Sequence, residues 1–81
     1  MLKLSAKSKL SSEEVIKRAV KFFGPDGYGL KVTEQDKCCG QFEGGGGGVR
    51  VITATEKKGI TVDIESREWD YQVKEFIGKI K

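Results

Sequence analysis

The chain opens with a strict alternation of apolar and polar residues. Leu2, Leu4 and Ala6 are each followed by a polar residue. Side chains of a strand point alternately to its two faces, so this pattern predicts a short strand with one buried face over residues 2–7.

The next segment has the pattern of an amphipathic helix. Ser11 precedes Glu14 by three residues, a capping-box spacing in which each side chain can satisfy a backbone N–H at the start of a helix. Apolar residues then recur at helical spacing, at Val15, Ile16, Ala19, Val20 and Phe23. The Gly-Pro-Asp-Gly stretch at residues 24–27 is expected to end the helix, because Pro cannot continue it and Gly readily adopts the left-handed cap conformation.

Period-two alternation returns in the middle of the chain and predicts four more strands. Residues 34–37 are predicted to form a turn, and residues 56–59 a hairpin turn. The expected strands cover residues 28–33, 38–43, 49–55 and 60–65.

The last segment, residues 66–81, is predicted to be helical. Ser66 is the expected cap. The apolar residues that share one helical face are Trp69, Val73, Phe76, Ile77 and Ile80. Gly78 lies within this helix, where it would allow close packing against a sheet.

These elements predict a single α+β domain over residues 1–81 with the order β-α-β-β-β-β-α. A meandering antiparallel sheet with both helices on its apolar face would bury all the apolar positions together. This element order resembles one repeat of the TATA-box-binding-protein fold. It is also similar to a trimmed helix-grip fold of the Bet v 1 and START domains. The first resemblance implies a saddle that a second copy would complete.

Composition limits the functional classes. Hydrophobic residues make up 37% of the 81-residue chain, which argues against disorder. No apolar run approaches the roughly 20 residues of a membrane-spanning helix, and the N-terminus lacks the apolar stretch of a signal peptide. The chain has no His, which removes the commonest general base and zinc ligand. We therefore expect a cytoplasmic protein without membrane association, enzymatic activity, cofactor or metal.

A run of glycines is the most conspicuous sequence feature. It leads into a strand, whereas a phosphate-binding loop has spaced glycines that open a helix. The favoured interpretation is a hairpin tip between strands. The alternative is a small-ligand site between the C-terminal helix and the sheet, formed by Gly44, Gly45, Gly46, Gly47, Gly48 and Arg50.

Two adjacent cysteines raise the question of redox or metal chemistry. With no His, the usual partner that generates a thiolate is missing, and two ligands are too few for a zinc site within one chain. If both residues lie on a strand, Cys38 points inward and Cys39 outward, an arrangement unsuited to bonding between them. A metal site shared across a dimer remains open.

Three acidic residues, Glu43, Asp63 and Glu65, are predicted on the outer face of the sheet. They could form paired carboxylates for acid–base chemistry, or a solvated face paired with Lys31 or Arg50. They also argue against DNA binding on that face.

Three functional hypotheses remain. The first is a non-enzymatic interaction module that uses the open sheet face or an edge strand, with a homodimer or another protein as partner. The second is the small-ligand site near the glycines. The third is weak nucleic-acid binding, because the net charge of +3 is concentrated in the N-terminal region, at Lys7, Lys9, Lys17, Arg18 and Lys21.

Overall fold

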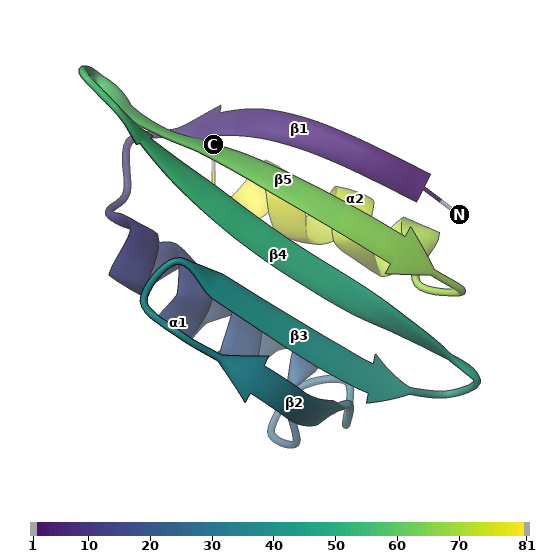
Figure 1. The fold of residues 1–81 in the computed structure, drawn as a ribbon. Helices are drawn as coiled ribbons and strands as arrows, with labels where there is room; N and C mark the ends of the chain where they lie inside the picture. Colours follow the sequence, from purple (N-terminus) through teal and green to yellow (C-terminus); the bar gives the residue numbers. More distant parts are fainter. Residues whose placement is uncertain (1, 81) are drawn as a thin grey trace.

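A computed structural model describes residues 2–80 and contains one antiparallel sheet with two helices on one of its faces (Figure 1). The elements follow the order β-α-β-β-β-β-α. Both the predicted α+β class and the placement of both helices on one face are confirmed. The elements are β1 (Leu2–Ser8), α1 (Ser12–Phe23), β2 (Lys31–Gln35), β3 (Cys39–Gly44), β4 (Gly47–Glu56), β5 (Gly59–Arg67) and α2 (Asp70–Ile80).

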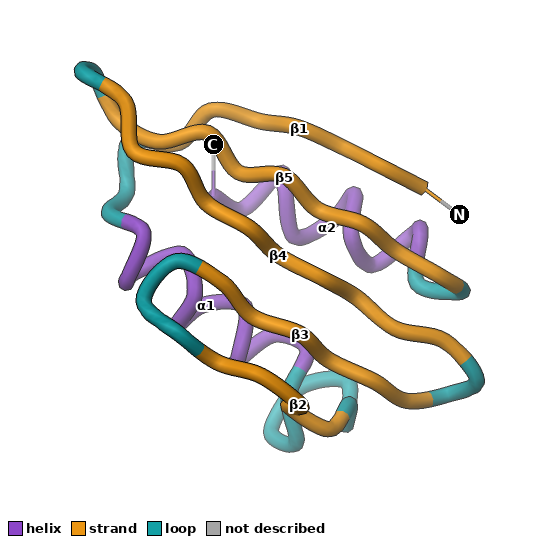
Figure 2. The backbone as a smooth tube through the Cα atoms, in the orientation of Figure 1, coloured by secondary structure: helices purple, strands orange, loops and turns teal. Residues whose placement is uncertain are grey.

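The strands lie in the order β1-β5-β4-β3-β2, and every pair is antiparallel. Strands β2 to β5 form a meander, and β1 completes the sheet beside β5 (Figure 2). This order leaves β1 and β2 as the two edge strands. The edges differ, because β1 pairs with β5 without interruption whereas β2 has a register shift between Val32 and Glu34.

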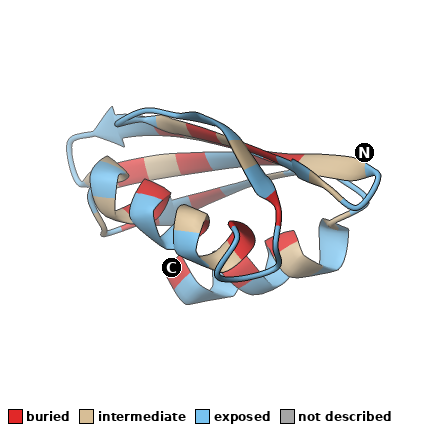
Figure 3. Cartoon of the chain, turned by 90° about the horizontal axis from the view of Figure 1, so that it is seen from below, coloured by how far each residue is buried: buried red, intermediate tan, exposed pale blue. Residues whose placement is uncertain are grey.

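The core lies between the sheet and the helix layer, and the opposite sheet face is not covered by any described element (Figure 3). The largest fully buried apolar side chains of the core are Phe23, Phe42, Phe76, Leu30, Ile64, Ile80, Val15, Val49, Val51, Val62 and Val73. The alternating strand positions and the two helical stripes therefore share one core, as the apolar pattern predicts.

Helix α1 begins and ends where predicted, but its last residue is followed by a different backbone conformation from the one expected. The Ser11 hydroxyl accepts the backbone N–H of Glu14 at 3.2 Å. The Gly24 N–H donates to the carbonyl of Val20, and Gly24 has a φ of −70° instead of the expected left-handed conformation. The positive φ falls later, at Gly29.

The second strand starts later than predicted. The N–H groups of Tyr28 and Leu30 donate back to the carbonyls of Phe22 and Phe23, so this segment folds against the end of α1. Those hydrogen bonds take the amides that a strand would use, and β2 begins only at Lys31.

The predicted start of the last helix is also wrong. Strand β5 continues to Arg67, and Ser66 is a buried strand residue whose hydroxyl donates to the Asp70 carboxylate at 3.0 Å. Trp69 is only partly buried, and its carbonyl accepts the N–H of Val73 at the start of α2. Gly78 does not approach the sheet, because a Cβ there would have open space around it.

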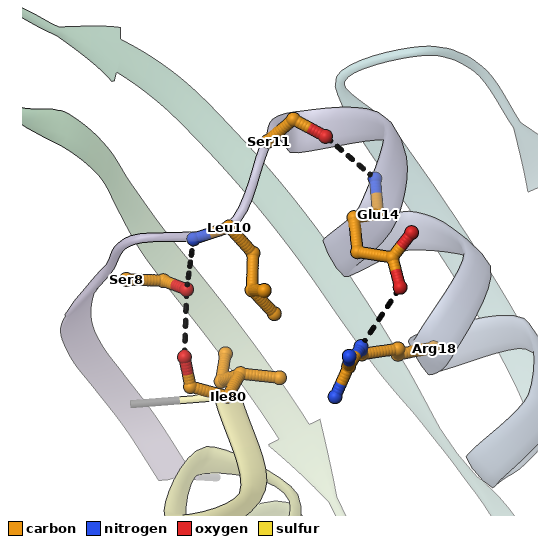
Figure 4. Close-up of polar contacts among 6 residues, drawn as sticks. All are labelled: Ser8, Leu10, Ser11, Glu14, Arg18 and Ile80. Carbon is orange, nitrogen blue, oxygen red and sulfur yellow. Dashed lines mark hydrogen bonds and ion pairs between the residues drawn. The ribbon is translucent and has the colours of Figure 1, made fainter.

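A hydrogen-bonded link joins the end of β1 to the end of α2 (Figure 4). The buried Ser8 hydroxyl donates to the carbonyl of Ile80 at 2.6 Å and accepts the N–H of Leu10 at 3.1 Å. One side chain thus satisfies an end carbonyl of the helix and orients the connection that leads into α1.

Candidate functional site

The glycine run forms the hairpin between β3 and β4. Gly44 ends β3 and Gly47 begins β4. Gly45 and Gly46 form the turn, with φ values of 60° and 82° in the left-handed region, which glycine adopts at no steric cost. The hairpin interpretation of the run is therefore confirmed.

The side of this hairpin that faces α2 is occupied by Trp69. The indole Nε1 donates to the carbonyl of Gly44 at 2.9 Å. A Cβ at Gly45 would lie 2.9 Å from the Trp69 ring, so the two groups are in close contact. The space that the small-ligand hypothesis places between α2 and the glycines thus holds this indole ring.

Two of the predicted ligand-binding residues meet on the opposite side, on the open face of the sheet. Gly48 and Arg50 line a hollow of about 220 Å³ together with Gln41, Glu65 and Arg67. Gly44, Gly45, Gly46 and Gly47 do not line it. The structure therefore brings Gly48 and Arg50 together and separates them from the rest of the proposed set.

The residues predicted to bind nucleic acid are divided between the two layers of the fold. Lys17, Arg18 and Lys21 lie on α1. Lys7 lies on β1 between two buried residues and is exposed on the open sheet face, while Lys9 lies in the connection between β1 and α1. Only the three helical cations lie on one element.

Arg18 and Lys21 also line a groove between the two helices. This groove has a volume of about 240 Å³, and its other lining residues are Phe22, Phe76, Lys79 and Ile80. The Lys79 ammonium lies 5.3 Å from the centroid of the Phe22 ring. The groove thus combines an apolar floor with three cationic side chains, which we call the interhelical groove.

Sequence reasoning missed the interhelical groove as a unit. The cations of α1 were visible as a charged face, but Lys79 and Phe76 come from the far end of the chain. Their position beside Phe22 depends on how α2 packs against α1, and the Phe22 and Phe76 rings lie 5.4 Å apart. One signal was present in the sequence. Phe22 is a second aromatic residue beside Phe23, and it lies outside the apolar face predicted for this helix.

The three acidic residues of the outer face lie on two strands, and Asp63 and Glu65 are two residues apart on the same face of β5. Glu43 lies on β3, whereas Asp63 and Glu65 lie on β5, with β4 between them. Two strand spacings separate the two sets by about 10 Å. Glu65 faces Arg50 across the strands and forms an ion pair with Lys3 at 3.4 Å, which fits a solvated face with paired charges.

The cysteines are arranged differently from the prediction. Cys38 lies in the turn before β3 and is exposed, so it does not point into the core. The two sulfur atoms are in direct contact. Hydrogen bonding to Cys38, together with burial, raises the pKa of the Cys39 thiol to about 11, and the nearby Arg50 only partly offsets this.

Over residues 2–80, no group of three or more acidic, Cys or His side chains is placed to hold a metal ion. None of the described helices is long and apolar enough to cross a membrane.

Comparison with known proteins identifies no family. No family model matches the chain, and neither a curated protein nor a solved structure matches it. The resemblance to a repeat of the TATA-box-binding protein therefore rests on the element order alone, and fold does not determine function.

Proposed function

We propose that this protein is a non-enzymatic interaction module that pairs with a second copy of itself through the edge strand β1. The observation that carries the proposal is the regular edge of β1, which spans seven residues without a bulge and has no partner strand within residues 2–80. An exposed regular edge offers a row of backbone donors and acceptors to another strand. The other edge, β2, is interrupted by its register shift, a feature that discourages such pairing.

Apolar side chains along β1 also favour this strand as the dimer interface. Leu2 and Leu4 point toward the helix layer but are only partly buried, whereas Ala6 is buried. Antiparallel pairing of two β1 strands about a two-fold axis at Leu4 would place Leu4 against Leu4 of the second copy. It would also place Leu2 against Ala6 of the second copy and bury apolar surface that the single chain leaves exposed.

The charges on β1 favour this register, with the two-fold axis at Leu4, over the register with the axis at Ser5. An axis at Leu4 sets Lys3 opposite Ser5 of the second copy, whereas an axis at Ser5 would set Lys3 opposite Lys7. Like charges directly opposite each other destabilise a strand pair. Lys3 is also already paired with Glu65 of its own chain at 3.4 Å, which reduces the positive charge near the edge.

The test compares matched substitutions on the two edge strands. Leu4→Lys places two ammonium groups at the axis and should raise the dimer dissociation constant at least about tenfold, a change of about 1.4 kcal/mol. Val32→Lys is the control, because Val32 is also a partly buried residue of an edge strand, on β2. Sedimentation velocity over a range of concentrations measures the dimer, and circular dichroism verifies that both variants fold.

Amide hydrogen exchange provides a second measurement without substitution. Every second N–H of β1 points away from β5 and is free in the single chain. These amides should become protected as the concentration rises through the dissociation range. A chain that stays monomeric at millimolar concentration, or a dimer lost in Val32→Lys and retained in Leu4→Lys, contradicts the proposal.

A second function is favoured by the chemistry of the interhelical groove. Three cationic residues, Arg18, Lys21 and Lys79, surround an apolar floor that includes Phe22 and Phe76. Within residues 2–80, Arg18 alone among these cations forms an ion pair, with Glu14 at 3.0 Å. Such a groove suits a small amphiphilic anion, whose carboxylate would meet the cations while its chain covers the rings.

Binding of aliphatic carboxylates tests this second function. Affinity for octanoate should exceed that for octanol, and Lys21→Gln should weaken octanoate binding about twofold to fivefold, the effect of losing one exposed charge contact. Lys31→Gln is the control, because Lys31 is an exposed lysine of β2 that does not line the groove. Equal binding of acid and alcohol in titrations followed by NMR, or equal losses in both variants, would refute it.

A further inference from the structure

The turn between β2 and β3 holds the two cysteine side chains together. Cys38 lies in the turn and Cys39 is the first residue of β3, so the alternation of a strand does not separate their side chains. Hydrogen bonds hold the backbone of both cysteines in place. The Cys38 carbonyl accepts both the N–H and the hydroxyl of Thr53 at 2.8 Å, and the Cys39 carbonyl accepts the N–H of Asp36 at 2.8 Å.

These contacts leave a pair of neighbouring thiols at the protein surface. The two sulfur atoms are in direct contact, Cys38 is exposed and Cys39 is half-buried. Cys39 borders a hollow of about 350 Å³ on the open sheet face, whose other lining residues include Glu34, Asp36 and Arg50. A small molecule can therefore reach the pair, and Arg50 provides a cation beside it.

We propose that Cys38 and Cys39 form a vicinal dithiol that closes reversibly to a disulfide by exchange with a small-molecule disulfide such as oxidised glutathione. The site is separate from the β1 edge, since β3 and β1 are separated by β4 and β5. It needs no metal and no third side chain.

The exchange proceeds in two balanced steps. The exposed Cys38 loses its proton to solvent, and its thiolate attacks one sulfur of oxidised glutathione, forming a mixed disulfide and releasing one glutathione thiolate. Cys39 then loses its proton and attacks the Cys38 sulfur, which breaks the mixed disulfide and releases the second glutathione. The protein dithiol loses two electrons and two protons, and oxidised glutathione gains them as two thiols.

The order of the two attacks follows from the environment of each sulfur. The pKa of Cys39 is raised to about 11 mainly by its hydrogen bond to Cys38, so near neutral pH Cys39 remains a thiol while both side chains are reduced. Once Cys38 is part of a mixed disulfide, it can no longer form a thiolate, and the repulsion that opposed ionisation of Cys39 is removed. Cys39 is then able to act as the resolving sulfur.

Strain makes the closed form easy to reduce. Disulfides usually join Cα atoms about 4.4–6.8 Å apart, whereas neighbouring residues across a trans peptide are held about 3.8 Å apart. Strained disulfides have more oxidising potentials and belong to the labile class. Closure would also move the peptide between the two residues and so disturb the two hydrogen bonds from Thr53 to Cys38.

Intact-mass spectrometry after incubation with oxidised glutathione and acid quenching tests the proposal. The wild-type chain should lose the mass of two hydrogen atoms and retain no glutathione, and a thiol reductant should reverse the change. Cys38→Ser and Cys39→Ser should each retain one glutathione, because neither can close the ring. The oxidised wild type should show faster hydrogen exchange at the Thr53 amide, and reduction should restore the slower rate.

Unfolding provides the control for the role of the fold. In guanidinium, the ratio of the closed disulfide to the mixed disulfide with glutathione should fall about tenfold, because the turn no longer holds the two sulfur atoms together. Three results would each overturn the proposal. These are a stable mixed disulfide on the folded wild type, disulfide-linked dimers as the main product, and an unchanged ratio after unfolding.

Discussion

Replacing Phe76 by Ala is expected to lower the free energy of unfolding by about 3–5 kcal/mol. Phe76 is 1% exposed, and its ring lies 5.4 Å from that of Phe22 and 5.3 Å from that of Phe23. It therefore joins the two helices at the centre of the core, and its loss would leave a cavity with aromatic walls. A domain of this size has a stability of only about 5 kcal/mol, so the variant should retain no more than about 2 kcal/mol and unfold at a much lower urea concentration than the wild type.

The matched control for Phe76→Ala is Tyr71→Ala on the same helix. Tyr71 is 73% exposed, so its replacement should change stability by less than about 0.5 kcal/mol. Denaturation in urea measures both variants. A loss below about 1 kcal/mol for Phe76→Ala would show that α2 does not pack as described.

The contrast between Phe76 and Trp69 shows what the apolar pattern could predict. Both residues fit the same helical stripe, and the stripe correctly identified the buried face of α2. It could not show where β5 ends, because Ser66 is a polar residue that is buried in a strand through its hydrogen bond to Asp70. With β5 extended to Arg67, Trp69 precedes the helix and packs against the glycine hairpin instead of lying fully in the core.

The candidate sites depend even more on tertiary contacts. The glycine hairpin and the cations of α1 follow from local sequence, so both were predictable. The interhelical groove needs Lys79 beside Phe22, and the dithiol needs a strand that begins at Cys39 instead of Cys38. A shift of one residue at a strand start changes the direction of a side chain, and alternation alone does not define where a strand begins.

Gly47→Ala is expected to destabilise the fold by about 2–3 kcal/mol, the usual cost of forcing extra atoms into a packed site. A Cβ at Gly47 would overlap the carbonyl oxygen of Arg67 and lie 2.8 Å from its carbonyl carbon. Both atoms belong to the backbone of β5, so no rotation of a side chain can relieve the overlap. The start of β4 must move away from the end of β5, where Gly48 pairs with Arg67.

Gly78→Ala makes the same chemical change with the opposite expected result. A Cβ at Gly78 meets nothing within 4 Å, and alanine favours a helix over glycine by about 1 kcal/mol. This variant should therefore unfold at a higher urea concentration than the wild type, and Gly47→Ala at a lower one. If Gly47→Ala matched the wild type, the hairpin would have to lie farther from β5, and the Trp69 indole could not then reach the Gly44 carbonyl at 2.9 Å. Because α2 starts directly after Trp69, that single contact links the placement of the glycine hairpin to the start of the helix.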